Sequence, residues 1–173
     1  ALQCDLADQE SIARLALPDR IDGLANVAGV PGTAPAATVL AVNTLGLQTL
    51  TYRVLDRMSA GSVIVNVASV AAQRNTTVDG QLARLMSVRD ADEVAAWLAD
   101  NPIGGSAAYD TSKRVLVDWT VMLSAALQPR GIRVVSVSPG PIDTPILADF
   151  EASMGSDSIA RSAAVVGRHG SAA

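Results

Sequence analysis

The chain has 173 residues, of which 49% are hydrophobic and 17% are charged, and its formal net charge is −4. A chain of this length and hydrophobic content can form one domain with a substantial core, which excludes a disordered protein. The negative charge and the lack of any Lys/Arg-rich run exclude a nucleic-acid partner, because such partners are bound by clustered cations. The single cysteine, Cys4, excludes an intrachain disulfide framework and fits a cytoplasmic protein.

No charged residue occurs from position 23 to position 52, but this run is not predicted to cross a membrane. It contains Asn26, Pro31, Pro35 and Asn43 together with several threonines and glycines, which a lipid-exposed helix tolerates poorly. The N-terminus shows no basic segment followed by an apolar one, as a secretory signal would. We therefore expect no membrane partner.

The first elements alternate between short apolar strands and helices. Residues 1–4 are predicted to be the end of a buried strand, and a short helix follows between Asp8, a good N-cap residue, and Pro18. Residues 21–27 are predicted to form a second strand that leads into a loop rich in glycine and proline. The apolar spacing over 37–58 predicts a largely buried helix, and the most strand-like run follows it at 62–67.

Residues 74–103 are more charged than their surroundings and are predicted to form a helical hairpin inserted into a single domain that spans residues 1–173. Two helical patterns lie in this segment, at 78–87 and 90–100. Trp97 on the second helix has three interpretations: packing of the hairpin, contact with another subunit, or a wall of a substrate entrance. Packing is the simplest of the three.

The last elements are a long apolar-striped helix over 109–128, a buried strand at 132–137, a turn-rich loop and a loosely amphipathic helix at 146–162. Because the strands are apolar throughout and alternate with helices, we expect an α/β fold with a parallel sheet covered by helices on both faces. Ligands bind at the carboxyl ends of the strands in such folds. Unusual residues follow the strands directly, so we expect them to form one site: Asp5, 26–29, Ser69 and 139–144.

Tyr109 and Lys113 share one face of the predicted helix, because residues four apart lie one turn apart. A nearby ammonium favours the phenolate, so we expect Lys113 to lower the pKa of Tyr109 toward the working pH. A tyrosine tuned in this way can transfer a proton in carbonyl–alcohol chemistry. Taken without other residues, the pair is also typical of an ordinary solvated helix surface.

Together these motifs resemble the short-chain dehydrogenase/reductase family. Its Tyr-x-x-x-Lys motif is matched by Tyr109 and Lys113, its catalytic serine by Ser69, and its Asn-Asn-Ala-Gly motif by 26–29, with Val27 in place of the second asparagine. Three further motifs are matched by Asp5 and Leu6, by Asn43 and Gly46, and by Pro139, Gly140, Ile142 and Thr144. Six matches in order over residues 5–145 specify the family far better than any single one.

The resemblance implies a Rossmann-like doubly wound fold and an NAD(P)-dependent oxidoreductase that interconverts a secondary alcohol and a ketone. It implies that Tyr109 is the general acid/base, that Lys113 lowers its pKa and binds the nicotinamide ribose, and that Ser69 binds the substrate oxygen. Asn43 would hold a water that connects Lys113 to solvent, although a core asparagine bonded to the backbone is an equally good interpretation. The cofactor would be bound by Tyr109, Lys113 and the following residues: Asp5, Leu6, Asn26, Ala28, Gly29, Pro139, Gly140, Ile142 and Thr144.

The glycine-rich phosphate loop of the family is not found in the sequence, and neither is the position that selects NAD or NADP. We expect that the chain starts near the end of the third strand and that the intact protein carries the missing strands and loop. The cofactor is then NAD or NADP, with NAD favoured by the subgroup that the chain resembles.

That subgroup is suggested by Ser69 and Tyr109, which are 40 residues apart, farther than in most of the family. The spacing resembles the bacterial 3α-hydroxysteroid dehydrogenase/carbonyl reductases, in which a helical insertion at this place alters subunit association. The resemblance implies a small apolar alcohol or ketone substrate, such as a hydroxysteroid, and a homo-oligomer, either a dimer or a tetramer. There are two alternatives. The protein is a carbonyl reductase for a small non-steroid ketone, or it is a non-catalytic relative of the family that acts as a binding or regulatory subunit.

Two other site classes are poorly supported by the sequence. A serine hydrolase is disfavoured because there is no Gly-x-Ser-x-Gly turn and the only histidine, His169, lies near the end of the chain. One cysteine and one histidine cannot build a metal site without several carboxylates.

Overall fold

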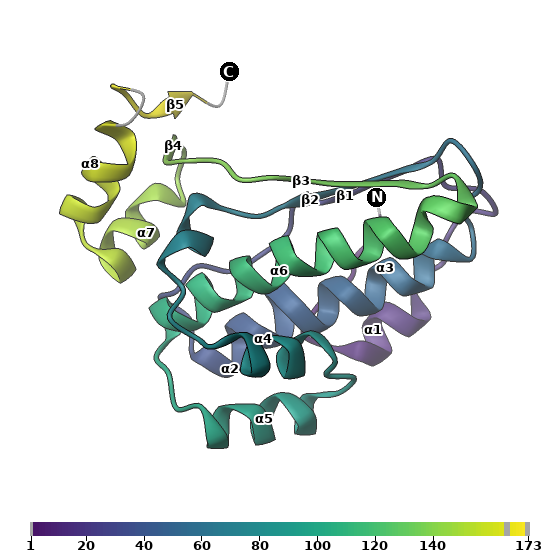
Figure 1. Cartoon of the computed structure of the whole chain (residues 1–173), viewed down its shortest axis with the longest axis horizontal. Helices are drawn as coiled ribbons and strands as arrows, with labels where there is room; N and C mark the ends of the chain where they lie inside the picture. Colours follow the sequence, from purple (N-terminus) through teal and green to yellow (C-terminus); the bar gives the residue numbers. More distant parts are fainter. Residues whose placement is uncertain (1, 165–166, 172–173) are drawn as a thin grey trace.

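The computed structural model describes residues 2–164 and 167–171. Its main sheet has three parallel strands in the spatial order β1–β2–β3, formed by Gly23–Asn26, Val63–Val67 and Arg133–Val137. The register pairs Asn26 with Asn66 and Asn66 with Ser136, so the carboxyl ends of all three strands meet at one edge (Figure 1). The predicted α/β class with a parallel sheet is confirmed.

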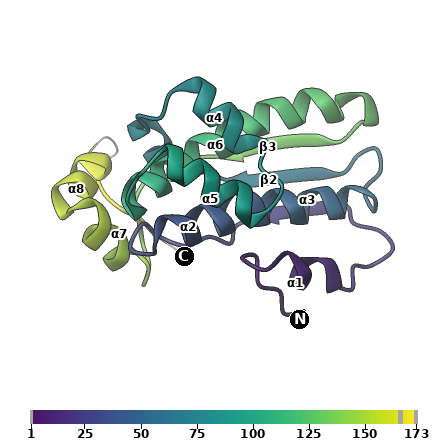
Figure 2. The same ribbon diagram turned by 90° about the horizontal axis from the view of Figure 1, so that it is seen from below.

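Helices form both connections between these strands. The first connection consists of α2 (Ala36–Leu40), the π-helical segment η1 (Ala41–Gly46) and α3 (Leu47–Leu55). The second consists of the 3₁₀ helix η2 (Val70–Arg74), α4 (Asp79–Met86), α5 (Ala91–Asp100), α6 (Gly105–Leu127) and the 3₁₀ turn η3 (Gln128–Arg130). Both sets of helices lie on one face of the sheet, together with α1 (Gln9–Arg14), as Figures 1 and 2 show.

The opposite face of the sheet is open in the described part of the chain. Val135 and Val137 of β3 are 46% and 47% exposed there, although they are valines of a strand with an apolar sequence. The described residues thus show one of the two helical layers that a doubly wound fold has.

The C-terminal part lies beyond the carboxyl ends of the main sheet. The short strand β4 (Ile142–Asp143) pairs in parallel with β5 (Gly170–Ser171), and the helices α7 (Leu147–Met154) and α8 (Ser156–Ala164) stand beside them (Figure 1). We call α7 and α8 the lid. The single helix predicted over 146–162 is wrong, because Gly155 adopts a φ of +82° that other residues rarely take, and the chain turns there.

The predicted strand over residues 1–4 is also wrong within its described part. Residues 2–4 have no regular structure, and Leu2 is 63% exposed. A strand is held by the hydrogen bonds of a neighbouring strand, and no described strand pairs with this segment. The apolar composition of residues 1–4 does not tell whether a neighbouring strand is present to form those hydrogen bonds.

The core is organised around α6, which packs between two apolar clusters. One cluster contains Val39, Leu40 and Tyr109, and the other contains Ile64 and Trp119. Two helices, α4 and α5, occur where the hairpin was predicted, and α5 lies against α2 (Figure 2).

Trp97 of α5 is fully buried in the first cluster, and its Nε1 donates a hydrogen bond to the carbonyl oxygen of Gln81 over 2.9 Å. Of its three interpretations, packing of the hairpin is the correct one. Whether the hairpin is an insertion relative to other proteins stays a prediction.

Candidate active site

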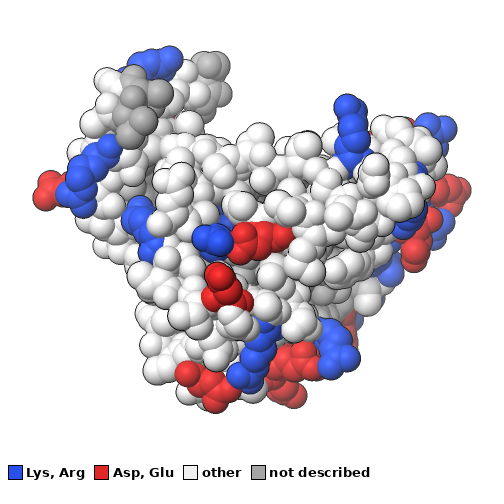
Figure 3. Space-filling view, viewed as in Figure 1, with Lys and Arg blue, Asp and Glu red and all other residues white. Residues whose placement is uncertain are grey.

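A cavity of about 350 Å³ lies where the carboxyl ends of the strands face the lid. In Figure 3 the surface between the lid and the sheet is hollowed and mostly free of charged side chains. Eight of the sequence-predicted site residues line this cavity: Gly29, Ser69, Tyr109, Lys113, Pro139, Gly140, Ile142 and Thr144. The expectation that segments following different strands meet at one place is therefore met for most of them.

Tyr109 and Lys113 lie in the first half of α6 and are both 6% exposed. The Lys113 ammonium lies 5.6 Å from the centre of the Tyr109 ring, as the four-residue spacing predicts. Its Nζ donates a hydrogen bond over 2.9 Å to the carbonyl oxygen of Val67, the last residue of β2. The end of β2 thereby fixes the lysine at the floor of the cavity.

The expected lowering of the Tyr109 pKa is not what the structure shows. Burial raises the pKa of Tyr109, because the phenolate is less well solvated there, and the nearby Asp110 carboxylate raises it further. A hydrogen bond with Ser69 and the charge of Arg74 act in the opposite direction and do not offset the burial. Burial also lowers the pKa of Lys113 to about 8, so the ammonium itself is costly in this site.

Ser69 follows β2 and caps the helix η2. Its Oγ accepts a hydrogen bond from the amide of Ala71 over 3.1 Å, which is ordinary N-cap chemistry. The preceding residue, Ala68, donates its amide hydrogen to the carbonyl oxygen of Val137, and Val70 donates to that of Pro139. These bonds hold the serine and the loop after β3 together at the cavity wall.

Asn43 is 1% exposed and lies in the π-helical segment η1. Its Oδ1 accepts a hydrogen bond from the amide of Val30 over 2.9 Å, and its Nδ2 donates to the carbonyl oxygen of Val30 over 3.0 Å and to Ser112 Oγ over 3.3 Å. The side chain therefore clamps the loop after β1 onto η1 and α6. A Cβ on Gly29 would lie 3.0 Å from Asn43 Oδ1, so a side chain there would push against the clamp.

The loop after β3 forms the opposite wall of the cavity. Ile142 belongs to β4, and the carbonyl oxygen of Pro141 accepts a hydrogen bond from the amide of Gly170 over 2.9 Å. Thr144 Oγ1 donates to the carbonyl oxygen of Ile142 over 3.3 Å. The C-terminal strand pair thus shapes the loop that carries the predicted carboxamide-binding residues.

Four predicted cofactor residues do not line the cavity: Asp5, Leu6, Asn26 and Ala28. The Asp5 carboxylate is exposed and accepts a hydrogen bond from the amide of Ala7. The amide of Asn26 is buried and donates to Asn66 Oδ1 over 2.8 Å and to Thr51 Oγ1 over 3.0 Å. Their roles in binding a cofactor stay predictions, and the position of Asn26 gives it a clear structural role as well.

Leu6 has a defined contact of its own. A Cβ added to Gly46 would lie 1.9 Å from the carbonyl oxygen of Leu6, so the segment after residue 4 packs directly on η1. The glycine of the Val-Asn-x-x-Gly motif is explained by this close approach of two backbones.

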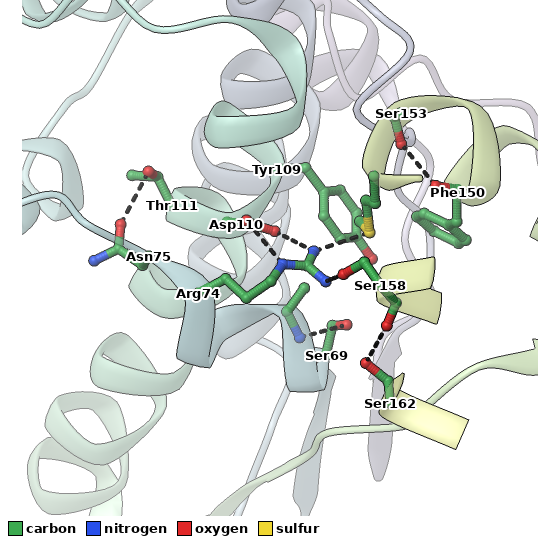
Figure 4. A network of polar contacts seen from close by, with 12 residues as sticks. Ser69, Arg74, Asn75, Tyr109, Asp110, Thr111, Phe150, Ser153, Ser158 and Ser162 are labelled. Carbon is green, nitrogen blue, oxygen red and sulfur yellow. Dashed lines mark hydrogen bonds and ion pairs between the residues drawn. The ribbon is translucent and has the colours of Figure 1, made fainter. Parts of the chain in front are cut away.

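Sequence reasoning missed Arg74, which also lines the cavity. Its guanidinium forms an ion pair with Asp110, with Nη2 to Oδ1 at 2.6 Å and Nε to Oδ2 at 3.1 Å (Figure 4). A signal was present in the sequence, since Asp110 follows Tyr109 directly and Arg74 comes five residues after Ser69. Opposite charges beside two motif residues would have suggested this pair.

The lid lines one side of the cavity with mainly apolar side chains. Phe150 and Met154 of α7 line the cavity, and the Phe150 ring packs against the Tyr109 ring with 5.2 Å between centroids and a tilt of 56°. Ile159 and Ser162 of α8 complete this side. Leu147 of α7 also lines the cavity, so the lid side of the cavity is mainly apolar.

A parallel α/β sheet with a serine after one strand and a buried tyrosine and lysine of α6 beside it is typical of Rossmann-like dinucleotide-binding proteins. Comparison with known proteins makes this more specific. A family model described as enoyl-(acyl carrier protein) reductase matches residues 93–173. The chain is 38% identical to a coniferyl-alcohol dehydrogenase of Pseudomonas sp. over 159 residues, and 30% identical to the mouse 15-hydroxyprostaglandin dehydrogenase [NAD(+)] over 162 residues. The chain belongs to the short-chain dehydrogenase/reductase family.

Those matches cover 90% and 87% of this chain but only 62% and 50% of the two relatives, so the chain spans about half to two thirds of their length. Among solved structures, the NADH complex of a 3-alpha-hydroxysteroid dehydrogenase from Pseudomonas sp. B-0831 is similar over 98% of this chain and 70% of its own. That similarity has a TM-score of 0.78 with 27% identity. A second structure, BdcA in complex with NADPH, has a TM-score of 0.59 with 20% identity and supports the fold alone.

Two further findings concern the described residues only. None of the helices in 2–164 is long and apolar enough to cross a membrane. No group of three or more His, Cys, Asp or Glu side chains in the described ranges could hold a metal ion.

Proposed function

We propose that the intact protein containing this chain is an NAD(P)-dependent oxidoreductase that interconverts an apolar secondary alcohol and its ketone. The observation that carries the proposal is the meeting of Ser69, Tyr109 and Lys113 at one apolar cavity on the carboxyl edge of a parallel sheet. Membership of the family supports it, because the relatives named above are dehydrogenases of alcohols.

The residues present fit the nicotinamide half of such a cofactor. Gly29 has no side chain beside Asn43 and Lys113, so a flat ligand can approach the backbone closely there. Lys113 uses one of its three N–H donors on Val67, which leaves others for a ribose hydroxyl. On the other wall, Ile142 and Thr144 would bind the carboxamide, and Pro139 and Gly140 would support the ring.

The adenine and pyrophosphate half of the cofactor would be bound by residues outside this cavity. Asp5, Leu6, Asn26 and Ala28 are the residues of this chain proposed for that side, and the glycine-rich loop is not found in the sequence. The choice between NAD and NADP belongs to the proposal, and the relatives point both ways: one structure is an NADH complex and another an NADPH complex.

When bound, the dinucleotide supplies hydride transfer, and the residues of this chain handle the proton and the developing charge. Tyr109 Oη takes the proton of the alcohol or returns it to the ketone oxygen. Ser69 Oγ donates a hydrogen bond to the same oxygen and stabilises its charge in the transition state. Lys113 lies beside the tyrosine ring and favours the phenolate whenever its ammonium is charged.

Asn43 would serve as a proton relay through a water next to Lys113. The structure shows that its amide is already bonded to Val30 and Ser112, so the backbone clamp is one role and the relay a further one. Both roles require the amide at this position, which leaves Asn43 in the proposed catalytic set.

The cavity favours an apolar substrate. Its lid side is lined by Leu147, Phe150, Met154 and Ile159, and its other side by Val70 and Ala71. A hydroxysteroid fits this lining, as does an aromatic alcohol, and the relatives are named for both kinds and for a hydroxyprostaglandin. The runner-up substrate is a small non-steroid ketone, which would leave part of the cavity of about 350 Å³ unfilled.

The test has two parts. Addition of the intact protein to NADH or NADPH should change the nicotinamide fluorescence, and the cofactor that responds identifies the preference. A panel of steroid, aromatic and short-chain aliphatic alcohols should then show turnover that increases with apolar size. A protein that binds neither cofactor would instead be the non-catalytic relative that binds or regulates.

A further inference from the structure

Arg74 joins the two elements that carry the proposed catalytic pair. It ends η2, the helix that Ser69 caps, and it holds Asp110 on α6, next to Tyr109. Two N–H groups of one guanidinium contact the two oxygens of one carboxylate, which fixes both position and orientation. The Asp110 side chain is 12% exposed, so this carboxylate depends on the arginine for its charge partner.

The same guanidinium also contacts the lid. Its Nη2 donates to Met154 Sδ of α7 over 2.9 Å, and its Nη1 donates to Ser158 Oγ of α8 over 3.5 Å. Figure 4 shows the guanidinium between Asp110 and the two lid helices, with the Tyr109 ring near it and the Phe150 ring beyond, tilted by 56° against that of Tyr109. The two lid contacts fall on either side of Gly155, the turn between α7 and α8.

We propose that Arg74 is a positioning residue that couples docking of the lid to the alignment of Ser69 and Tyr109. The coupling follows from geometry, since one planar group cannot move toward the lid without moving Asp110 or losing it. A docked lid holds the guanidinium in place, the guanidinium holds Asp110, and Asp110 holds the second turn of α6 against η2. A lifted lid loosens all three contacts together.

A simpler interpretation is that the ion pair only stabilises the fold. The two interpretations differ in whether loss of the ion pair changes the pKa of Tyr109. The charged groups that face Tyr109 are Arg74 from η2 and Asp110 and Lys113 from α6, whereas α7 contributes the Phe150 ring and keeps its acidic residues at the surface. Arg74 lowers the pKa of Tyr109 and Asp110 raises it, so loss of each partner has an opposite effect on the tyrosine.

The experiment, which rests on the proposed function for its catalytic part, compares Arg74→Met, Arg74→Lys and Asp110→Asn in the intact protein. Arg74→Met should reduce kcat by about 10²-fold with a smaller change in KM, because misplacement of a reacting group costs that much. Its kcat/KM profile should shift to higher pH, and that of Asp110→Asn to lower pH. Arg74→Lys should recover part of kcat, since it restores the charge without the two-point geometry.

A matched control is Arg84→Met, which breaks an Arg–Asp pair between α4 and α5 away from the cavity. It should leave kcat and the pH profile unchanged. If Arg74→Met behaves like this control, or if both variants of the pair shift the profile in the same direction, the proposal is wrong. If Arg74→Met does not fold, Arg74→Lys and Ser158→Ala decide, since neither removes a buried charge.

A second readout does not depend on catalysis. Trypsin should cleave after Arg161 in the exposed part of α8 roughly fivefold faster in Arg74→Met and Ser158→Ala than in the unmodified protein, the ratio that one ordinary hydrogen bond accounts for. An unchanged cleavage rate would contradict the proposal that Arg74 holds the lid in place. A protein that shows no dehydrogenase activity but the expected cleavage pattern would fail the proposed function and keep the lid coupling.

Discussion

At the residue scale, burial is the dominant influence on the proposed catalytic groups. Tyr109 and Lys113 are almost inaccessible, and desolvation shifts each pKa toward the neutral form. The four-residue spacing correctly indicated that the two side chains are neighbours, but spacing does not reveal how much water remains around them. The sign of the tyrosine shift was therefore decided by packing.

Tyr109→Phe tests the acid/base role. The substitution keeps the ring that packs on Phe150 and removes only the hydroxyl, so the fold and cofactor binding should be nearly unchanged. Turnover should fall by about 10³-fold, as expected for loss of a positioned acid/base. Steady-state kinetics with a titration of the cofactor check this, and a variant with near-normal turnover would show that another group transfers the proton.

Lys113→Met tests the cost of burying the ammonium. Its pKa is about 8 in the folded state and 10.5 ordinarily, so below pH 8 both states are protonated and the full cost of burial is present. Between these values the folded state releases the proton and the unfolded state keeps it, so stability rises with pH. Over this range, the free energy of unfolding of the unmodified protein should rise by about 3 kcal/mol relative to that of Lys113→Met.

Urea unfolding at several pH values between 7 and 11 measures that difference. A difference that stays constant across the range would mean that Lys113 titrates in the folded protein as it does in water.

At the element scale, the segments that position the site are held by close backbone contacts as well as by side chains. Asn43 clamps the loop after β1 from the π-helical η1, and the glycine three residues later touches the backbone of Leu6. The same scale explains the error over 146–162, where apolar spacing continued through a glycine that turns the chain.

Gly46→Ala tests this contact. An added Cβ would lie 1.9 Å from the carbonyl oxygen of Leu6, so either η1 or the segment after residue 4 must move. We expect a loss of about 1–3 kcal/mol in the free energy of unfolding, as for other overpacked sites. Gly80→Ala is the matched control, because nothing lies within 4 Å of its Cβ in α4, and there alanine should stabilise by about 0.5–1 kcal/mol. Two variants that change stability in the same direction would contradict this explanation.

At the scale of the whole molecule, a buried polar ladder ties the sheet to both covering helices. Asn26 of β1 bonds to Thr51 of α3 and to Asn66 of β2, and Asn66 bonds to Thr120 of α6. Asn66 is fully buried, so its amide has no access to water if a partner is lost.

Asn66→Ala should therefore lower the free energy of unfolding by about 1–3 kcal/mol, because Asn26 Nδ2 and Thr120 Oγ1 each lose one of their two hydrogen-bond partners in the core. Thermal unfolding followed by circular dichroism measures the loss. A double variant that also replaces Asn26 with leucine should recover part of it, and no recovery would mean that the ladder acts by packing alone. Sedimentation velocity of the intact protein would measure whether it forms the expected homo-oligomer.

The sequence by itself determined the α/β class, the parallel strands other than residues 1–4, and the family, because apolar strands, helix spacing and ordered motifs are local properties. It also placed Ser69 and residues 139–144 at one edge of the sheet, since residues that follow parallel strands meet there, and the family motifs added Tyr109 and Lys113 to that site. Only the tertiary structure decided the pKa of Tyr109, the structural role of Asn26, the burial of Trp97 and the ion pair of Arg74 with Asp110. Each of these depends on which groups from distant parts of the chain surround a side chain and exclude water from it, and no local pattern carries that information.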